Sequence, residues 1–393
     1  MAKWMLATAL ACGFQLVATT GWTQSDPGIT QDTIRVGIIG PFSGPAAEYS
    51  KAQVGAISYL RSINDQGGIH GRQFELLVED DSCEEAKGIA AARKLIFDSE
   101  VFALASAYAC SGPALAAKSV IIESGVPWMI GGAASGELTN PVAKTVFQPT
   151  ATTPDVGRAM VRFAASKPGA KKIAVISHSN EWAKGYYDGA IEQMKETYGA
   201  PPALDLTMER QSTNATPQIL KLREASPDVV IAILYPAEMS VFLREAKKFS
   251  LDTTFVTGYG TTVEDQLRRT GDPGAVKNLY AAYLLAAPVN SASMKPWRDM
   301  VKKYYPSEDL TTANFQGMGG ILTFVEAVRK VGPELTRAKL VEALENIRDF
   351  DAFPMAGRFS FTPTDHAAQK DLSFAGFVDG KVTIFSAWDK VTE

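Results

Sequence analysis

The sequence predicts an α/β protein with two runs of strands and helices, each forming a mostly parallel sheet with helices on both faces. Three observations support the α/β part of this prediction. Short apolar runs alternate with stretches of helical length, which favours strand–helix–strand units. The alternation occurs twice, before and after residues 148–150, so each run can form its own sheet. A chain of 393 residues also exceeds one ordinary core.

The first run supplies four strands and three helices. Residues 34–39 form an apolar strand that ends at the glycine- and proline-rich segment 40–45, and a helix follows over 47–65. Ser82 and Glu85 have the spacing of a capping box that opens the next helix. The remaining predicted elements are strands 74–78, 101–105 and 126–130 and helices 84–97 and 112–123.

The second run repeats this pattern and ends in a different one. Residues 279 onward begin with a strand-like stretch and continue into three helices. In the tail, Asp379 and Gly380 form the turn of an antiparallel hairpin. The predicted strands are 172–177, 204–208, 229–234, 255–257, 358–361, 374–378 and 381–385, and the predicted helices are 182–198, 217–225, 237–249, 295–304, 313–331 and 336–347.

Residues 1–24 have the pattern of a secretory signal peptide. Lys3 provides a positive start, residues 4–18 are mostly apolar, and small or polar residues follow. Cys12 either leaves with this segment or is a site of lipidation. No later segment has 18 uninterrupted apolar residues, so we expect a soluble mature protein. The net charge of −4 includes no basic stripe, which makes nucleic acid and anionic membranes poor partners.

Two cysteines have similar local settings. Cys83 and Cys110 each follow a short apolar run and precede a helix-like stretch. This places both at the carboxyl ends of neighbouring strands, where α/β sheets bind ligands. Cysteines so placed suggest a disulfide, and a disulfide implies an oxidising compartment.

The chain lacks the common catalytic patterns: G-x-S-x-G, H-E-x-x-H, C-x-x-C and the P-loop. We therefore predict no enzyme, no cofactor and no metal. His178 follows a strand and is either a ligand contact or a structural residue. An acidic cluster could bind a divalent cation, although helix capping explains it better; its members are Asp80, Asp81, Glu84 and Glu85. Small residues at 40–45, 111–112 and 131–136 fit either anion binding or ordinary turns.

Together these segments resemble the periplasmic leucine/isoleucine/valine-binding proteins of ABC importers, over about residues 30–390. The most specific parts of the resemblance are 40–49, 67–71, 80–83 with 110–111, and 125–139. The resemblance implies the type I periplasmic binding protein fold, in which two doubly wound parallel-sheet lobes are joined by three crossovers. The first lobe would contain 30–150 plus 284–355 and the second lobe 151–283 plus 356–393, with the ligand between them. It also implies a monomeric periplasmic receptor that delivers its ligand to permease subunits.

The resemblance also implies a ligand site. Ser111 and Ser135 correspond to residues that bind a carboxylate, with Ala133 and Ala134 supplying backbone groups. The aromatic side chains expected near the site are Tyr49, Tyr108, Trp182, Tyr235, Tyr259 and Phe315. One position departs from the family, because Gly260 stands where amino-acid binders have a glutamate that pairs with the ligand ammonium.

Three hypotheses follow for the function. The first is a receptor for an aromatic acid of benzoate or cinnamate type, because aromatic side chains stack on flat rings and a buried ammonium without its carboxylate is costly. The second is an amino-acid receptor in which Glu181, Glu238 or Glu264 replaces the missing carboxylate. The third is a ligand-sensing regulatory protein on the same fold, against which the predicted signal peptide argues.

Overall fold

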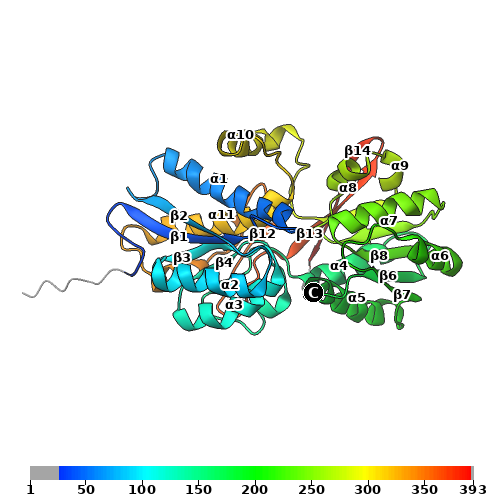
Figure 1. The fold of residues 1–393 in the computed structure, drawn as a ribbon, viewed down its shortest axis with the longest axis horizontal. Helices are drawn as coiled ribbons and strands as arrows, with labels where there is room; N and C mark the ends of the chain where they lie inside the picture. The colour runs from blue at the N-terminus through cyan, green and yellow to red at the C-terminus, as the bar shows by residue number, and fades with distance from the viewer. Residues whose placement is uncertain (1–25, 391–393) are drawn as a thin grey trace, which may run out of the picture.

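The computed structural model describes residues 26–390, so the predicted signal peptide and Cys12 lie outside the described residues. Two halves lie side by side along the long axis of the molecule, each built on a sheet with helices on both faces (Figure 1). Within residues 26–390, no helix combines the length and apolar character needed to cross a membrane.

The first half contains a five-stranded parallel sheet in the order β2-β1-β3-β4-β5. Its strands are β1 (Thr33–Gly40), β2 (Gln73–Asp80), β3 (Ala103–Ala107), β4 (Trp128–Ile130) and β5 (Val146–Phe147). Ile38 and Ile39 are consecutive in β1 and both fully buried, in core clusters on opposite faces. Burial on both faces explains why the strands are nearly continuous apolar runs.

Helices from distant parts of the chain cover this first sheet. One face packs against α1 and α11, and the other against α2 and α3 (Figure 1). Because α11 comes from beyond residue 300, the first half is discontinuous in sequence. The helices of this half are α1 (Lys51–Asp65), α2 (Glu85–Arg93), α3 (Ser111–Ser124), α10 (Lys295–Tyr304), α11 (Ala313–Val331) and α12 (Arg337–Glu345).

The second half contains a seven-stranded sheet in the order β14-β13-β10-β9-β8-β6-β7. The strands from β7 to β10 are parallel, and β13 and β14 are antiparallel additions. The strands are β6 (Ile173–Ser177), β7 (Leu204–Thr207), β8 (Val229–Ile233), β9 (Thr254–Thr257), β10 (Leu279–Tyr283), β13 (Asp371–Val378) and β14 (Lys381–Lys390). The helices are α4 (Thr153–Ala165), α5 (Glu181–Tyr198), α6 (Thr216–Ala225), α7 (Pro236–Lys248), α8 (Val263–Thr270) and α9 (Pro273–Val276).

Three connections join the halves: β5 to α4, β10 to α10, and the short strand β12 (Arg358–Phe359) to β13. They are hydrogen-bonded to one another. The Ala368 amide donates to the Gln148 carbonyl at 2.8 Å, and the Ala356 amide donates to the Leu284 carbonyl at 2.7 Å. Strand β12 pairs with β11 (Phe350–Asp351) and packs beside α11, so it belongs with the first half. We therefore propose that the third lobe boundary follows Phe359 rather than residue 355. We keep the two other proposed boundaries, near residues 150 and 284.

Most predicted elements occur in the structure, and α10 and α11 have the predicted bounds. The hairpin turn is confirmed, since Asp379 and Gly380 have φ values of 49° and 77° and Val378 pairs with Lys381. Helices α4 and α8 and strand β5 were not predicted from the sequence. The predicted capping box is wrong: Ser82 adopts a φ of 47° and bonds to Ser43, so the helix begins after Glu84.

Candidate ligand-binding site

A cavity of about 300 Å³ lies between the two halves. Its lining residues come from both halves and follow the carboxyl ends of the parallel strands, which is where α/β sheets bind ligands. The volume is at the lower end of the range for small-molecule sites. Six of the predicted ligand residues line it: Tyr49, Ser111, Trp182, Tyr235, Tyr259 and Gly260.

Three aromatic side chains form one side of the cavity, and we call them the aromatic wall: Tyr49, Trp182 and Tyr235. Trp182 stacks on Tyr235 with ring centroids 4.3 Å apart and an interplanar angle of 15°. Tyr49, from the first half, approaches Tyr235 at 5.6 Å. Burial raises the pKa of Tyr49 far above its usual range, so its hydroxyl stays neutral. The wall therefore spans the cleft with uncharged, partly buried ring surface.

The central ring of the wall is fixed from behind by His178. The Tyr235 amide donates to His178 Nε2 at 3.1 Å, and His178 Nδ1 donates to the Met208 carbonyl at 2.6 Å. Because Nε2 must accept a hydrogen bond, the ring is neutral, and burial accordingly lowers the pKa of His178. Asn180 Nδ2 donates to the Tyr235 hydroxyl at 3.3 Å. His178 does not line the cavity, so its role is to position Tyr235.

Ser111 is the first residue of α3, a helix of 14 residues whose N-terminus faces the cavity. Its Oγ accepts a hydrogen bond from the Ala134 amide at 3.4 Å. Within the described part of the chain, the hydroxyl proton of Ser111 has no acceptor. A carboxylate in the cavity would supply one, and the positive end of the helix dipole favours an anion there.

The predicted disulfide is present between Cys83 and Cys110, with 5.7 Å between their Cα atoms, and both residues line the cavity. The strands before them are not neighbours, because β1 lies between β2 and β3. The loops after β2 and β3 converge across the end of β1 instead. The disulfide thus joins two loops that frame Ser111 from one side.

The acidic residues near Cys83 organise the loop. Asp80 Oδ1 accepts hydrogen bonds from the amides of Phe42 and Ser82, both at 2.9 Å. Asp81 is fully buried; its Oδ1 accepts from the Cys83 amide at 2.9 Å, while its Oδ2 has no partner. Burial raises the pKa of Asp81 to about 6. Among the described residues, no group of histidine, cysteine and acidic side chains is arranged to bind a metal.

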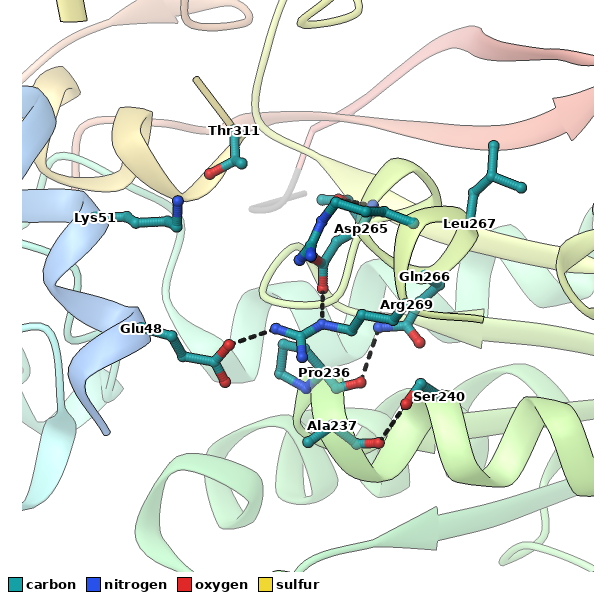
Figure 2. A network of polar contacts seen from close by, with 12 residues as sticks. Glu48, Lys51, Pro236, Ala237, Ser240, Asp265, Gln266, Leu267, Arg269 and Thr311 are labelled. Carbon is teal, nitrogen blue, oxygen red and sulfur yellow. Dashed lines mark hydrogen bonds and ion pairs between the residues drawn. The ribbon is translucent and has the colours of Figure 1, made fainter. Parts of the chain in front are cut away.

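Polar contacts cross the cleft beside the cavity. Arg269 on α8 pairs with Asp265 of its own helix at 2.6 Å and reaches Glu48 of the first half (Figure 2). The hydroxyls of Thr262 and Thr312, one from each half, are 3.4 Å apart. These contacts join the two halves beside the cavity.

Sequence reasoning missed Arg210, which also lines the cavity. Its guanidinium carbon lies 4.6 Å from the centroid of the Tyr235 ring. The adjacent Gln211 amide donates to the buried carboxylate of Glu238 at 2.5 Å, which fixes the loop that carries Arg210. The sequence did contain a sign that Arg210 could contact the ligand. The predicted strand 204–208 ends just before Arg210, at the edge of the second sheet where ligands are expected.

Five predicted residues do not line this cavity. Tyr108 is fully buried, donates to the Gly88 carbonyl at 2.8 Å and packs edge-on against Trp128. Phe315 is buried in the core beside Trp297. The others are Ala133 and Ala134, which are buried behind Ser111, and Ser135, which lines a separate polar cavity.

Ser135 is turned away by its local structure. Its Oγ accepts a hydrogen bond from the Glu137 amide and begins a short 3₁₀ helix, so the hydroxyl serves as a cap. Of the three carboxylates considered as replacements at Gly260, only Glu181 lines the cavity. Glu238 binds the Gln211 amide, and Glu264 accepts from the Tyr283 hydroxyl.

Gly260 faces the cavity next to the aromatic wall. A Cβ atom built at this position would lie 3.5 Å from Cζ2 of Trp182, which is ordinary contact distance. A longer side chain here would compete with the Trp182 ring for space. Glycine therefore leaves room for the ring and provides no charge.

Two α/β halves, three connections and a ligand-sized cavity between the halves define a bilobal solute-binding protein. The family of periplasmic binding proteins matches residues 33–381, and the chain belongs to this family. The family resemblance and the fold predicted from the sequence are thereby confirmed.

Several known proteins are similar to the chain. The leucine-, isoleucine-, valine-, threonine-, and alanine-binding protein of Pseudomonas aeruginosa is 26% identical over 316 residues, which cover 80% of this chain and 82% of that protein. The Leu/Ile/Val-binding protein of Escherichia coli (strain K12) is 24% identical over 226 residues, 57% of this chain and 61% of that protein. The chain is thus a substrate-binding protein of the ABC importer class.

Solved structures share the fold at lower identity. The branched-chain amino acid transporter substrate binding protein of Streptococcus pneumoniae, in complex with isoleucine, superimposes with a TM-score of 0.77 at 24% identity, covering 90% of this chain and 99% of that one. A branched chain amino acid ABC transporter from Thermus thermophilus with bound valine gives 0.81 at 17% identity, with coverage of 91% and 96%.

Proposed function

We propose that this protein is a monomeric periplasmic receptor that captures a small aromatic carboxylate and delivers it to an ABC importer, after removal of residues 1–24. The observation that supports this proposal most strongly is the aromatic wall of Tyr49, Trp182 and Tyr235 in a cavity that also contains the N-terminus of α3. A ring and a carboxylate are the two ligand features that this arrangement matches.

In the proposed complex, the carboxylate accepts a hydrogen bond from the Ser111 hydroxyl at the start of α3. The ring of the ligand packs against the exposed surface of Trp182 and Tyr235, and Tyr49 covers it from the first half. Offset or edge-on ring pairs contribute about 0.5–1.5 kcal/mol beyond the area they bury. Because both halves contact the ligand, binding favours the closed arrangement.

The absence of a side chain at Gly260 supports a ligand without an ammonium group. A buried ammonium needs a carboxylate partner, and leaving it unpaired costs several kcal/mol. An aromatic acid has no such group.

An amino-acid ligand is the second candidate, and one specific feature favours it. Glu181 lines the cavity and, across residues 26–390, forms no ion pair. It could pair with an ammonium group in place of the family glutamate. The names of the relatives from Pseudomonas aeruginosa and Escherichia coli also point to branched-chain amino acids.

Isothermal titration calorimetry with benzoate, cinnamate, leucine and phenylalanine distinguishes the two candidates. We expect binding of at least one aromatic acid and no response to either amino acid. Trp182→Leu should weaken aromatic-acid binding by roughly 2- to 13-fold. Trp297→Leu is the matched control, because Trp297 stacks on Tyr59 away from the cavity. Tight binding of leucine or phenylalanine without any response to the aromatic acids would establish the second candidate.

A further inference from the structure

We infer that Arg210 is a specificity-determining residue that binds a second acidic group of the ligand, so that the preferred ligand is an aromatic dicarboxylic acid. This inference rests on the proposed function and extends it to the far end of the ligand. It begins with the charges of the cavity.

The cavity is lined by four cationic side chains, of which three have carboxylate partners. Lys51 pairs with Glu308 at 2.8 Å. Arg268 and Arg269 both pair with Asp265, and Arg269 also reaches Glu48 (Figure 2). Arg210 has no carboxylate partner within residues 26–390, although it lies in the same cavity. Its charge is therefore the one available to an anionic ligand.

Arg210 is also held in position. Its guanidinium lies over the Tyr235 ring, and a cation above an aromatic face is attracted by the ring quadrupole. Gln211, with a φ of 63°, is anchored to the carboxylate of Glu238. Burial raises the pKa of Tyr235, and the nearby charge of Arg210 opposes that rise. The Arg210 side chain is otherwise exposed and its guanidinium donates no hydrogen bond within the described residues, so its planar N–H groups are available to bind a carboxylate bidentately.

The two anion-binding groups come from different halves of the protein and line the same cavity. Ser111 belongs to the first half, after β3, and Arg210 belongs to the second half, after β7. The aromatic wall lies in the same cavity. A ring with carboxylates at opposite ends would place one on Ser111, one on Arg210 and its face on the wall. Such a ligand would connect both halves directly, whereas a monocarboxylate would leave Arg210 without a counter-ion.

Calorimetry with benzoate and terephthalate (benzene-1,4-dicarboxylate) tests the inference, using the full mature chain. We expect wild-type protein to bind terephthalate at least tenfold more tightly than benzoate. Arg210→Met should weaken terephthalate binding by about 10- to 150-fold, since a hydrogen bond to a charged group is lost, and should change benzoate binding by less than about twofold. Arg210→Lys should restore only part of the preference, because lysine cannot bind bidentately.

Arg268→Met is the matched control, since Arg268 lines the same cavity but is already paired. It should leave both affinities unchanged. Equal loss of benzoate and terephthalate in Arg210→Met would mean that Arg210 binds the only carboxylate, and would overturn the inference while leaving an acid receptor. A wild-type preference for benzoate would also overturn the inference alone. Failure of both acids to bind would overturn the inference, and failure of cinnamate as well would overturn the proposed function.

Discussion

Replacing Asp81 with asparagine should stabilise the folded protein at neutral pH. Asp81 is buried next to the disulfide, and its Oδ2 has no hydrogen-bond partner. Its pKa is about 6, compared with an ordinary value of 3.8. This difference corresponds to roughly 3 kcal/mol of folding free energy above pH 6. Asparagine keeps the oxygen that accepts from the Cys83 amide and removes the charge, so we expect a gain of about 1–3 kcal/mol.

The sign of the pH dependence follows from the same values. Because the folded state binds the Asp81 proton more tightly, the stability that it provides is complete below pH 3.8 and is lost as the pH rises through 6. The Asp81→Asn variant should therefore nearly match wild type near pH 4, exceed it increasingly up to about pH 6, and keep a nearly constant advantage from there to pH 7.5. Urea unfolding followed by tryptophan fluorescence at several pH values, with the disulfide intact, measures the difference.

The neighbouring Asp80 provides a control of opposite sign. Burial favours a higher pKa for Asp80, but hydrogen bonds from Ser43 and from backbone amides lower it below the ordinary value. Asp80→Asn should therefore destabilise the protein at pH 7.5. If Asp81→Asn is destabilising at pH 7.5, or if its effect does not change between pH 4 and 7.5, the argument from burial is wrong.

Three further predictions test the site. Ser111→Ala should weaken aromatic-acid binding by about 10- to 150-fold, whereas Ser135→Ala should change it by less than about twofold, because only Ser111 lines the cavity. Calorimetry on both variants measures this difference, and equal effects would contradict the placement of the carboxylate at Ser111. Because burial lowers the pKa of His178, its neutral ring supports the aromatic wall at pH 6.5 and above and is lost only when the pH falls through that lowered pKa, so wild-type affinity should stay constant from pH 7.5 to 6.5 and decline in more acidic solution, and His178→Gln should remove this decline. Glu48→Gln should cost about 0.2–1 kcal/mol in ligand affinity at low salt and nothing at 1 M salt, since its partner Arg269 is partly exposed; a salt-independent effect would rule out the ion pair as its cause.

The sequence predicted the features that depend on local patterns. The bounds of α10 and α11 follow from apolar spacing, and the Asp379-Gly380 turn follows from the backbone freedom of those two residues. The predicted capping role of Ser82 failed because other groups bind its hydroxyl. Ser43, which is distant in sequence, and Asp80, which is two residues away, both form hydrogen bonds with the Ser82 Oγ.

The site itself was predictable in part. Six predicted residues meet in the cavity because strand ends are recognisable and parallel strands share one edge. Side-chain direction was not predictable: Tyr108 has a φ of 69° and turns its ring into the core. Arg210 was missed because its position depends on a contact that is distant in sequence. Glu238 on α7 accepts a hydrogen bond from the Gln211 amide and so fixes the loop that carries Arg210.

The connections between the halves determine how the molecule can move. We call the three connections together the joint. The Gln148 carbonyl is hydrogen-bonded to the Ala368 amide, and the Leu284 carbonyl to the Ala356 amide. Gln369 Nε2 also donates to the Ala356 carbonyl at 3.1 Å, so each connection of the joint is hydrogen-bonded to another. The Tyr259 hydroxyl adds a fourth contact, to the Ala151 carbonyl of the first connection at 3.1 Å. A rotation of one half would therefore move the three connections together, and Tyr259, which lines the cavity, is hydrogen-bonded to the first of them. A fluorophore placed near this joint would report occupancy of the cavity without touching the ligand.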